Sequence, residues 1–152
     1  MKRLIASVLI ALGALPAAAT DADTLARDTV FATQDATDLA PFIWTKRPIV
    51  VFADTPADPR FAEQVALLEA EATELLERDV VVVLDTDPAA ASPLRRKLRP
   101  RGFMMVLIGK DGGVKLRKPF AWDVRELSRA IDKMPMRLQE MRGASQVRQP
   151  EG

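Results

Sequence analysis

The sequence predicts an α/β domain with the element order β-α-β-α-β-β-α. Two observations carry this prediction. Three separate runs of β-branched and other apolar residues show no polar alternation, which is typical of strands that are covered on both faces. Between and after these runs, apolar residues recur at helical spacing. Hydrophobic residues make up 48% of the 152 residues and charged residues 28%, which is the composition of a globular domain with a core.

The first strand is expected at residues 48–53, Pro-Ile-Val-Val-Phe-Ala. The turn after it ends at Asp58 and Pro59, a good N-cap followed by a residue suited to the first helical position. From Phe61 to Leu75, apolar residues lie three or four apart. This spacing predicts one amphipathic helix of about five turns.

The second strand is expected at residues 80–84, followed by a short helix at 93–98 and a third strand at 103–108. Asp111 and Gly112 then predict a hairpin turn. The fourth strand, at 114–117, alternates polar and apolar residues, so we expect a charged edge strand with one solvated face.

The last helix is expected to open at Asp123, with Glu126 placed to complete a capping box, and to end at Pro135. Its buried face would consist of four residues: Val124, Leu127, Ala130 and Ile131. Parallel strands joined by helices need right-handed crossovers, which place helices on both faces of the sheet. The order therefore predicts a thioredoxin-like fold with a four-stranded mixed sheet.

Residues 1–19 have the three parts of a secretory signal peptide: the basic residues Lys2 and Arg3, an apolar run over 4–15, and a small residue at Ala19. The apolar run is shorter than the roughly 20 residues that a membrane span requires. We therefore expect cleavage near Ala19, a mature chain without a transmembrane segment, and a periplasmic or secreted location.

The rest of the chain divides by composition. Residues 20–38 are mostly small and polar and predict a flexible leader, with at most one helical turn near Leu25. Residues 39–142 carry the strands and helices of the thioredoxin-like domain. Residues 143–152 predict a disordered tail.

Several function classes are excluded by composition. The chain has no cysteine and no histidine, which rules out thiol redox chemistry, zinc sites of the Cys/His type and nucleophiles that need histidine. Lys2 and Arg3 belong to the signal, so 20 of the 22 basic residues remain against 21 acidic ones. This near-neutral balance gives no reason to expect a nucleic acid partner. We assign neither a cofactor nor a metal.

Three stretches, at residues 77–82, 107–117 and 131–137, resemble the domain of unknown function 4174 family, and the resemblance extends over about residues 39–142. This family occurs in bacterial exported proteins and as modules of animal extracellular proteins of the sushi-repeat and equarin type. The resemblance implies a thioredoxin-like, peroxiredoxin-related fold. It implies no particular activity, because none is established for the family.

The chain departs from thioredoxins at the redox site. Pro56 and Pro59 stand where thioredoxins carry two cysteines, and Met104 stands where they hold a cis-proline. A cis bond before a non-proline residue costs about 2.5–4 kcal/mol, so we expect a trans bond at Met104.

Acidic residues cluster at the expected ends of the first two strands. Asp54, Asp58, Asp85 and Asp87 are the members of this acidic edge. Ligands of α/β sheets gather at such ends, and carboxylates suit Ca²⁺, Mg²⁺ or acid–base chemistry. The same residues are also common as helix caps and turn formers, and that structural interpretation is favoured.

A basic run follows the second strand and is a possible anion-binding site. Its members are Arg95, Arg96, Lys97, Arg99 and Arg101. The alternative is a solvated helix face that pairs with glutamates of the long helix. A further possibility is a Cu(I) site built from Met104, Met105, Met134 and Met136, although methionine more often fills a core.

We therefore expect an exported thioredoxin-like domain that binds a protein or an anionic cell-envelope component and has no catalytic residues. The alternative is a cysteine-independent enzyme or metal-binding protein. Its acid or base would be Asp54, Asp58 or Asp85, and Arg60 or Arg101 would contact an anion.

The first prediction concerns redox chemistry. The purified mature chain is expected neither to reduce insulin disulfides nor to consume peroxide by a thiol route, because disulfide exchange needs a thiolate and the chain has no cysteine. The measurement is insulin turbidity and peroxide consumption against a protein-free blank. Turnover above that blank, in a preparation shown to be free of contaminating reductase, would contradict the prediction.

Overall fold

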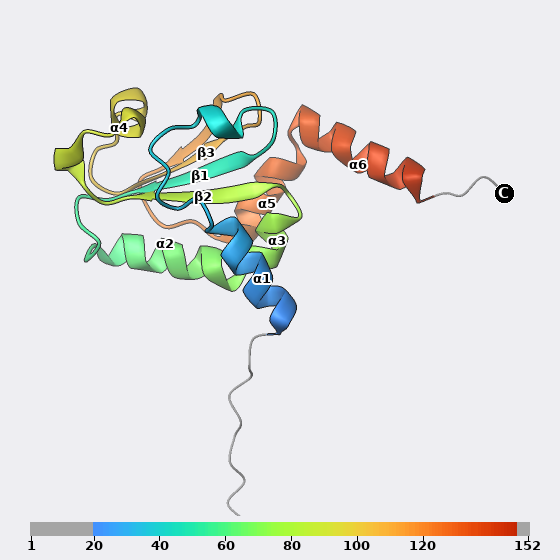
Figure 1. Cartoon of the computed structure of the whole chain (residues 1–152), viewed down its shortest axis with the longest axis horizontal. Coiled ribbons are helices and arrows are strands. Elements are labelled where there is room, and N and C mark those ends of the chain that lie inside the picture. Colours follow the sequence, from blue (N-terminus) through green and yellow to red (C-terminus); the bar gives the residue numbers. More distant parts are fainter. Residues whose placement is uncertain (1–19, 149–152) are drawn as a thin grey trace, which may run out of the picture.

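The structure is a computed structural model that describes residues 20–148, and its centre is a four-stranded mixed sheet in the order β2-β1-β3-β4 (Figure 1). The strands are β1 (Arg47–Phe52), β2 (Val80–Asp85), β3 (Met104–Ile108) and β4 (Val114–Lys118). β1 pairs with β2 in parallel and with β3 antiparallel, and β4 returns antiparallel to β3. The α/β class and the mixed sheet are therefore confirmed. Of the neighbouring strands in the sheet, only β1 and β2 are parallel, and a helical crossover connects them.

Helices cover both faces of this sheet (Figure 1). The α-helices are α1 (Asp21–Val30), α2 (Pro59–Ala70), α3 (Ala72–Leu76), α4 (Pro93–Leu98), α5 (Val124–Asp132) and α6 (Pro135–Val147). Two 3₁₀ turns are η1 (Ala40–Phe42) and η2 (Pro88–Ala90). The helices α1, α2, α3 and α5 lie on one face, η1 and α4 lie on the other, and α6 projects from the body. Among residues 20–148, no helix is long and apolar enough to cross a membrane.

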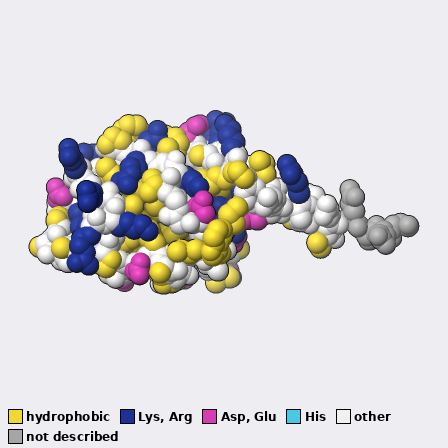
Figure 2. Space-filling model, turned by 90° about the horizontal axis from the view of Figure 1, so that it is seen from above, with side chains coloured by type: hydrophobic (Ala, Val, Ile, Leu, Met, Phe, Trp, Pro, Cys, Tyr) yellow, Lys and Arg dark blue, Asp and Glu magenta, His cyan; other side chains and the backbone are white. Residues whose placement is uncertain are grey.

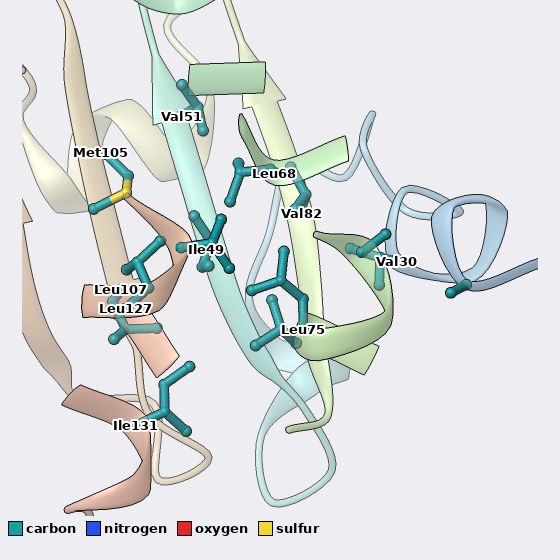
Figure 3. Packing of buried hydrophobic residues seen from close by; sticks show 14 of the residues in the cluster. Val30, Ile49, Val51, Leu68, Leu75, Val82, Met105, Leu107, Leu127 and Ile131 are labelled. Carbon is teal, nitrogen blue, oxygen red and sulfur yellow. The ribbon is translucent and has the colours of Figure 1, made fainter. Parts of the chain in front are cut away.

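The alternation of side chains along β1 divides the core into two layers. Ile49 and Val51 face α2, α3 and α5, where they meet Leu68, Leu75 and Leu127 (Figure 3). The intervening residues of β1 face the second layer, whose members include Val50, Phe52, Leu39, Phe42, Leu94 and Leu98. Successive side chains of a strand point to opposite faces, and both faces of β1 are apolar. Each face therefore has to be covered by its own layer.

The segment predicted as a flexible leader is instead part of the domain. Thr20 caps α1 by accepting a hydrogen bond from the Asp23 backbone N–H, and Thr73 of α3 donates to the Asp23 carboxylate at 3.0 Å. Ala26 and Val30 are buried in the core layer, where α1 packs against α3. Only these two residues of α1 are buried, so the apolar pattern was too sparse to signal a helix.

Two further boundaries differ from the sequence prediction. The single helix expected over 61–75 is interrupted at Glu71, which lets Ala72 and Leu75 turn inward beneath α1. The expected disordered tail begins inside α6, which continues to Val147, while residues 149–152 lie outside the described residues. Pro135 opens α6 rather than ending α5, because proline is tolerated in the first turn of a helix. The signal peptide expected at residues 1–19 also lies outside the described residues.

A buried charge network fixes the start of α6 to the sheet. The Arg47 guanidinium is 1% exposed and donates two hydrogen bonds to the Glu140 carboxylate, at 2.9 and 3.2 Å. Lys110 donates to Glu140 and to Asp79, each at 2.7 Å. Burial by itself raises the pKa of Glu140, but hydrogen bonds from Arg47 and Lys110 outweigh it and lower the pKa from 4.5 to about 2.

The second prediction follows from this network. Glu140→Gln should lower the free energy of unfolding at pH 7 by about 2–4 kcal/mol, because it leaves the buried Arg47 charge unpaired. The loss should shrink as pH falls from 4.5 toward 2, since the wild-type carboxylate then takes up its proton and loses the same stabilisation. Urea unfolding across this pH range measures both effects.

Glu126→Gln is the matched control, because its partner Arg129 is 63% exposed. Breaking this surface pair should change stability by less than about 0.5 kcal/mol. Equal losses in the two variants would show that Glu140 does not hold α6.

Candidate functional site

The carboxyl ends of β1 and β2 lie side by side, as predicted. Phe52 and Asp85 are paired in the sheet register, and the Ala53 N–H donates to the Asp85 carbonyl at 3.0 Å. The acidic edge and the basic run both border this end of the sheet, because the acidic turn follows β1 and α4 follows β2.

The side chain of Arg95 links the ends of β1 and β2 through hydrogen bonds. Its Nε donates to Asp85 Oδ1 at 2.7 Å, and its Nη2 donates to the carbonyls of Ala53 at 2.7 Å and Asp85 at 3.0 Å. The guanidinium also lies over the Phe52 ring, 5.4 Å from its centre. Ser92, the N-cap of α4, donates to Asp85 Oδ2 at 2.6 Å. These contacts make Arg95 a structural anchor and not part of an exposed anion-binding surface, which differs from the sequence prediction.

Asp85 is correspondingly held as a carboxylate. Burial raises its pKa, but hydrogen bonds from Ser92 and Arg95 outweigh that effect, so the pKa of Asp85 lies below its ordinary value. Both of its oxygens accept hydrogen bonds inside the protein. A carboxylate in this state is poorly suited to exchange protons near neutral pH.

The carboxylates of the other three acidic-edge residues have other roles, although the Asp87 backbone N–H donates to Asp85 Oδ1 at 3.2 Å. Asp58 caps α2 and pairs with Arg60 at 2.7 Å, and the hydrogen bond from Arg60 lowers its pKa. Asp87 accepts from two backbone N–H groups of η2. Asp54 is exposed. Within residues 20–148, no group of three or more acidic side chains could hold a metal ion.

Four members of the basic run form an exposed surface, which we call the α4 surface: Arg96, Lys97, Arg99 and Arg101. They lie around α4, whose inner side buries Leu94 and Leu98. Figure 2 looks onto this face of the molecule and shows Lys and Arg side chains gathered at the end that carries α4. No salt bridge joins these four to a carboxylate in the described part of the chain, whereas pairing with the glutamates of α2 and α3 was the structural alternative.

Arg60, the other cation considered for an anion contact, is engaged locally. It is held by Asp58 and lies over the Phe103 ring at 5.5 Å. Arg101 is exposed at the approach to β3. Arg60 is therefore paired with Asp58, whereas Arg101 has no salt-bridge partner among the described residues.

The four methionines considered for copper do not form one group. Met105 is buried in the core layer with Ile49, whereas Met104 packs against the opposite layer. Met134 and Met136 line a small cavity at the root of α6 together with Arg47 and Lys110. Such positive neighbours oppose the binding of a cation.

The turn after β1, at which the sequence comparison with thioredoxins was made, is exposed at Pro56, and Pro59 begins α2. The peptide bond before Met104 is trans, as expected, and no cis bond occurs among residues 20–148. With no cysteine in the chain, no residue here supplies a thiolate.

Several important side chains were missed from the sequence. Arg47 and Glu140 are 93 residues apart, and no local pattern links them. Ser92 could have been found, because a serine directly before Pro93 is a typical N-cap. Ser128 is buried in α5, and the sequence gave no sign of this, because a serine within a helix usually lies at the surface.

The fold and this end of the sheet define a class: an α/β domain with a mixed four-stranded sheet, no thiol, and a basic surface at the carboxyl end of its parallel strands. A family model for a domain of unknown function, DUF4174, matches residues 38–140. The chain belongs to the DUF4174 family. No curated protein matches it.

The third prediction separates the buried member of the acidic edge from an exposed one. Asp85→Asn should lower the free energy of unfolding by about 2–4 kcal/mol, because Arg95 is only 10% exposed and loses its charged partner. Asp54→Asn, the control, should change it by less than about 0.5 kcal/mol. Thermal and urea unfolding of both variants provides the measurement, and an intact stability in Asp85→Asn would contradict the anchoring role.

Proposed function

We propose that the protein is an exported thioredoxin-like domain without redox chemistry, and that its α4 surface binds an anionic component of the cell envelope. The proposal rests on the location of the four exposed basic residues and on their lack of salt-bridge partners among the described residues. They share one end of the fold, and no carboxylate of the described chain neutralises them.

The thioredoxin-like part of the proposal rests on topology. A β-α-β unit formed by β1, α2 and β2 precedes a β-hairpin and helix formed by β3, β4 and α5. The strand order β2-β1-β3-β4 places the two units side by side, with helices on both faces of the sheet. The DUF4174 match covers this region and supports the same proposal.

Export is supported by the position of the first helix. The signal sequence is expected to be cleaved after Ala19, and Thr20, the next residue, is the N-cap of α1. Cleavage at this bond would remove the signal and leave α1 with its cap, its acidic first turn and its buried residues. The mature N-terminus would therefore coincide with the start of the folded domain.

The α4 surface is held rigidly although its charges are exposed. Arg95 and Ser92 fix α4 to Asp85, and Arg117 of β4 donates to the Leu98 carbonyl at 2.6 Å. Arg99 ends α4 in a left-handed conformation, with φ of 48°. A surface whose backbone is fixed loses little entropy on binding, and this favours recognition of an anionic layer.

The expected strength is modest. Each basic residue near an anionic membrane contributes about 1 kcal/mol, so four correspond to a dissociation constant of about 1 mM for a single domain. Attachment of this kind weakens steeply with salt, because exposed charges are screened over about 8 Å at physiological ionic strength. Aromatic side chains that could stack on bases are not interleaved with the run, so nucleic acid is not the proposed partner.

The fourth prediction tests this surface. The mature protein should co-sediment with vesicles containing phosphatidylglycerol, or elute late from a heparin-type resin, at low salt but not at high salt. Changing Arg96, Lys97, Arg99 and Arg101 to Gln should abolish the retention. Arg95 stays unchanged, because its replacement would disturb the fold.

The matched control removes four exposed basic residues elsewhere: Arg27, Lys133, Arg142 and Arg148. This variant should keep most of the retention, although its net charge equals that of the α4 variant. Equal retention of both variants would mean that the α4 surface is only a solvated helix face. Comparison of vesicles with resin distinguishes a lipid from a polysaccharide.

A further inference from the structure

An exposed aromatic segment follows β4, and we call residues 118–122 the aromatic loop. Phe120 is 52% exposed, although it is a large apolar side chain. Trp122 is half-buried and packs against the core layer. Lys118, the last residue of β4, holds its ammonium group over both rings, 4.4 Å from the centre of the Trp122 ring and 5.9 Å from that of Phe120. The loop therefore presents an apolar ring and a cation side by side.

A buried glutamine fixes the backbone of the aromatic loop. Gln64 of α2 is completely shielded from solvent. Its Nε2 donates to the Trp122 carbonyl at 3.1 Å, and its Oε1 accepts from the Trp122 N–H at 2.8 Å. Asp123 caps α5 directly after the loop. Because the backbone is held in this way, presenting Phe120 to a partner costs little conformational entropy.

The aromatic loop and the α4 surface lie at the same end of the sheet. β3 runs antiparallel to β1 and to β4, so β4 ends near the carboxyl end of β1. Met105 pairs with Lys118, which places the aromatic loop beside the segment that leads from Arg101 into β3. Arg117 connects the two regions, because its Nη1 donates to the Leu98 carbonyl of α4 at 2.6 Å. The helix α6 projects from the other end of the molecule (Figure 1).

Positive charge is in excess at this end of the fold. Within residues 20–148, Arg117 and Lys118 have no salt-bridge partner, like the four residues of the α4 surface. Asp54, Asp87 and Asp123 are exposed at the same end and reduce this charge without reversing it. An anionic partner therefore complements the surface, and the partner also has to accommodate the exposed ring of Phe120.

We infer that this end of the protein docks on an anionic lipid bilayer, with Phe120 inserted at the boundary between headgroups and acyl chains. The inference rests on the proposed function and names its anionic component as a lipid layer. Aromatic rings and lysines with an apolar stem both suit the interface of a bilayer, where an apolar zone lies directly beneath a charged one. Base stacking is disfavoured, because Lys118 already lies over the Trp122 ring and that ring packs against the core.

The fifth prediction uses the two tryptophans of the chain as reporters. Trp44 precedes β1 and Trp122 lies beyond its other end, so the length of the strand, about 20 Å, separates them. The probe is a vesicle of phosphatidylglycerol and phosphatidylcholine whose acyl chains carry nitroxide labels. In Trp44→Phe, vesicles should quench most of the fluorescence of Trp122, since quenching needs close approach. In Trp122→Phe, the fluorescence of Trp44 should change little, although the protein still co-sediments.

A substitution in the aromatic loop separates insertion from charge attraction. Phe120→Ala should weaken partition onto the same vesicles about fivefold, because part of the ring no longer leaves water. Its elution from a heparin-type resin should not change, since the α4 surface is intact. Ile43→Ala, the control, removes a 39% exposed apolar residue before β1 and should change neither quantity. Urea unfolding should show equal stability in both variants and the wild type, because both side chains are largely exposed.

Each outcome supports or overturns the inference. Co-sedimentation without quenching of Trp122, or an unchanged partition of Phe120→Ala, would overturn the insertion but leave the α4 surface as an anion-binding site. Retention on the resin, or binding to a single-stranded oligonucleotide, without binding to vesicles would overturn the lipid layer alone. Equal quenching of Trp44 and Trp122 would overturn the orientation. Absence of binding to vesicles and resin alike would overturn the proposed function as well.

Discussion

The structure depends on the burial of β1 on both faces. The residues from Ile49 to Phe52 are completely shielded from solvent, and successive side chains of a strand point to opposite sides. The strand is therefore stable only when two separate layers cover it at once. The helices α2, α3 and α5 supply one layer, and η1 with α4 supplies the other. The requirement to cover both faces of β1 fixes the position of each of these elements. The α4 surface lies on the outer side of one of these elements.

Burial also explains why an ion pair lies at each end of β1. Arg47 at its start and Arg95 beyond its end are almost fully shielded, and a buried charge needs a partner. Glu140 of α6 and Asp85 at the end of β2 provide those partners. Both pairs join elements that are distant in sequence, so they fix α6 and α4 to the sheet. Leu94 and Leu98 fill the inner side of α4, which leaves Arg96 and Lys97 exposed on its outer side.

The folded unit is larger than the family match. DUF4174 accounts for residues 38–140, whereas α1 lies before it and contributes Ala26 and Val30 to the core. The Gln34 carbonyl also accepts from the Leu84 N–H, which covers part of the outer edge of β2. An uncovered strand edge invites association with other chains, so this segment protects the sheet on one side while the charged β4 protects it on the other.

The sequence by itself determined the features that are encoded locally. The strands around Ile49, Val82 and Val106, and the caps at Asp58 and Asp123, follow from periodicity and capping within a few residues. The tertiary structure alone decided the burial of α1, the inward turn of Arg95 and the pairing of Arg47 with Glu140. It also brought the aromatic loop after β4 to the end of the fold that carries α4. These features join residues tens of positions apart, and such contacts arise only when the double cover of β1 has brought the elements together.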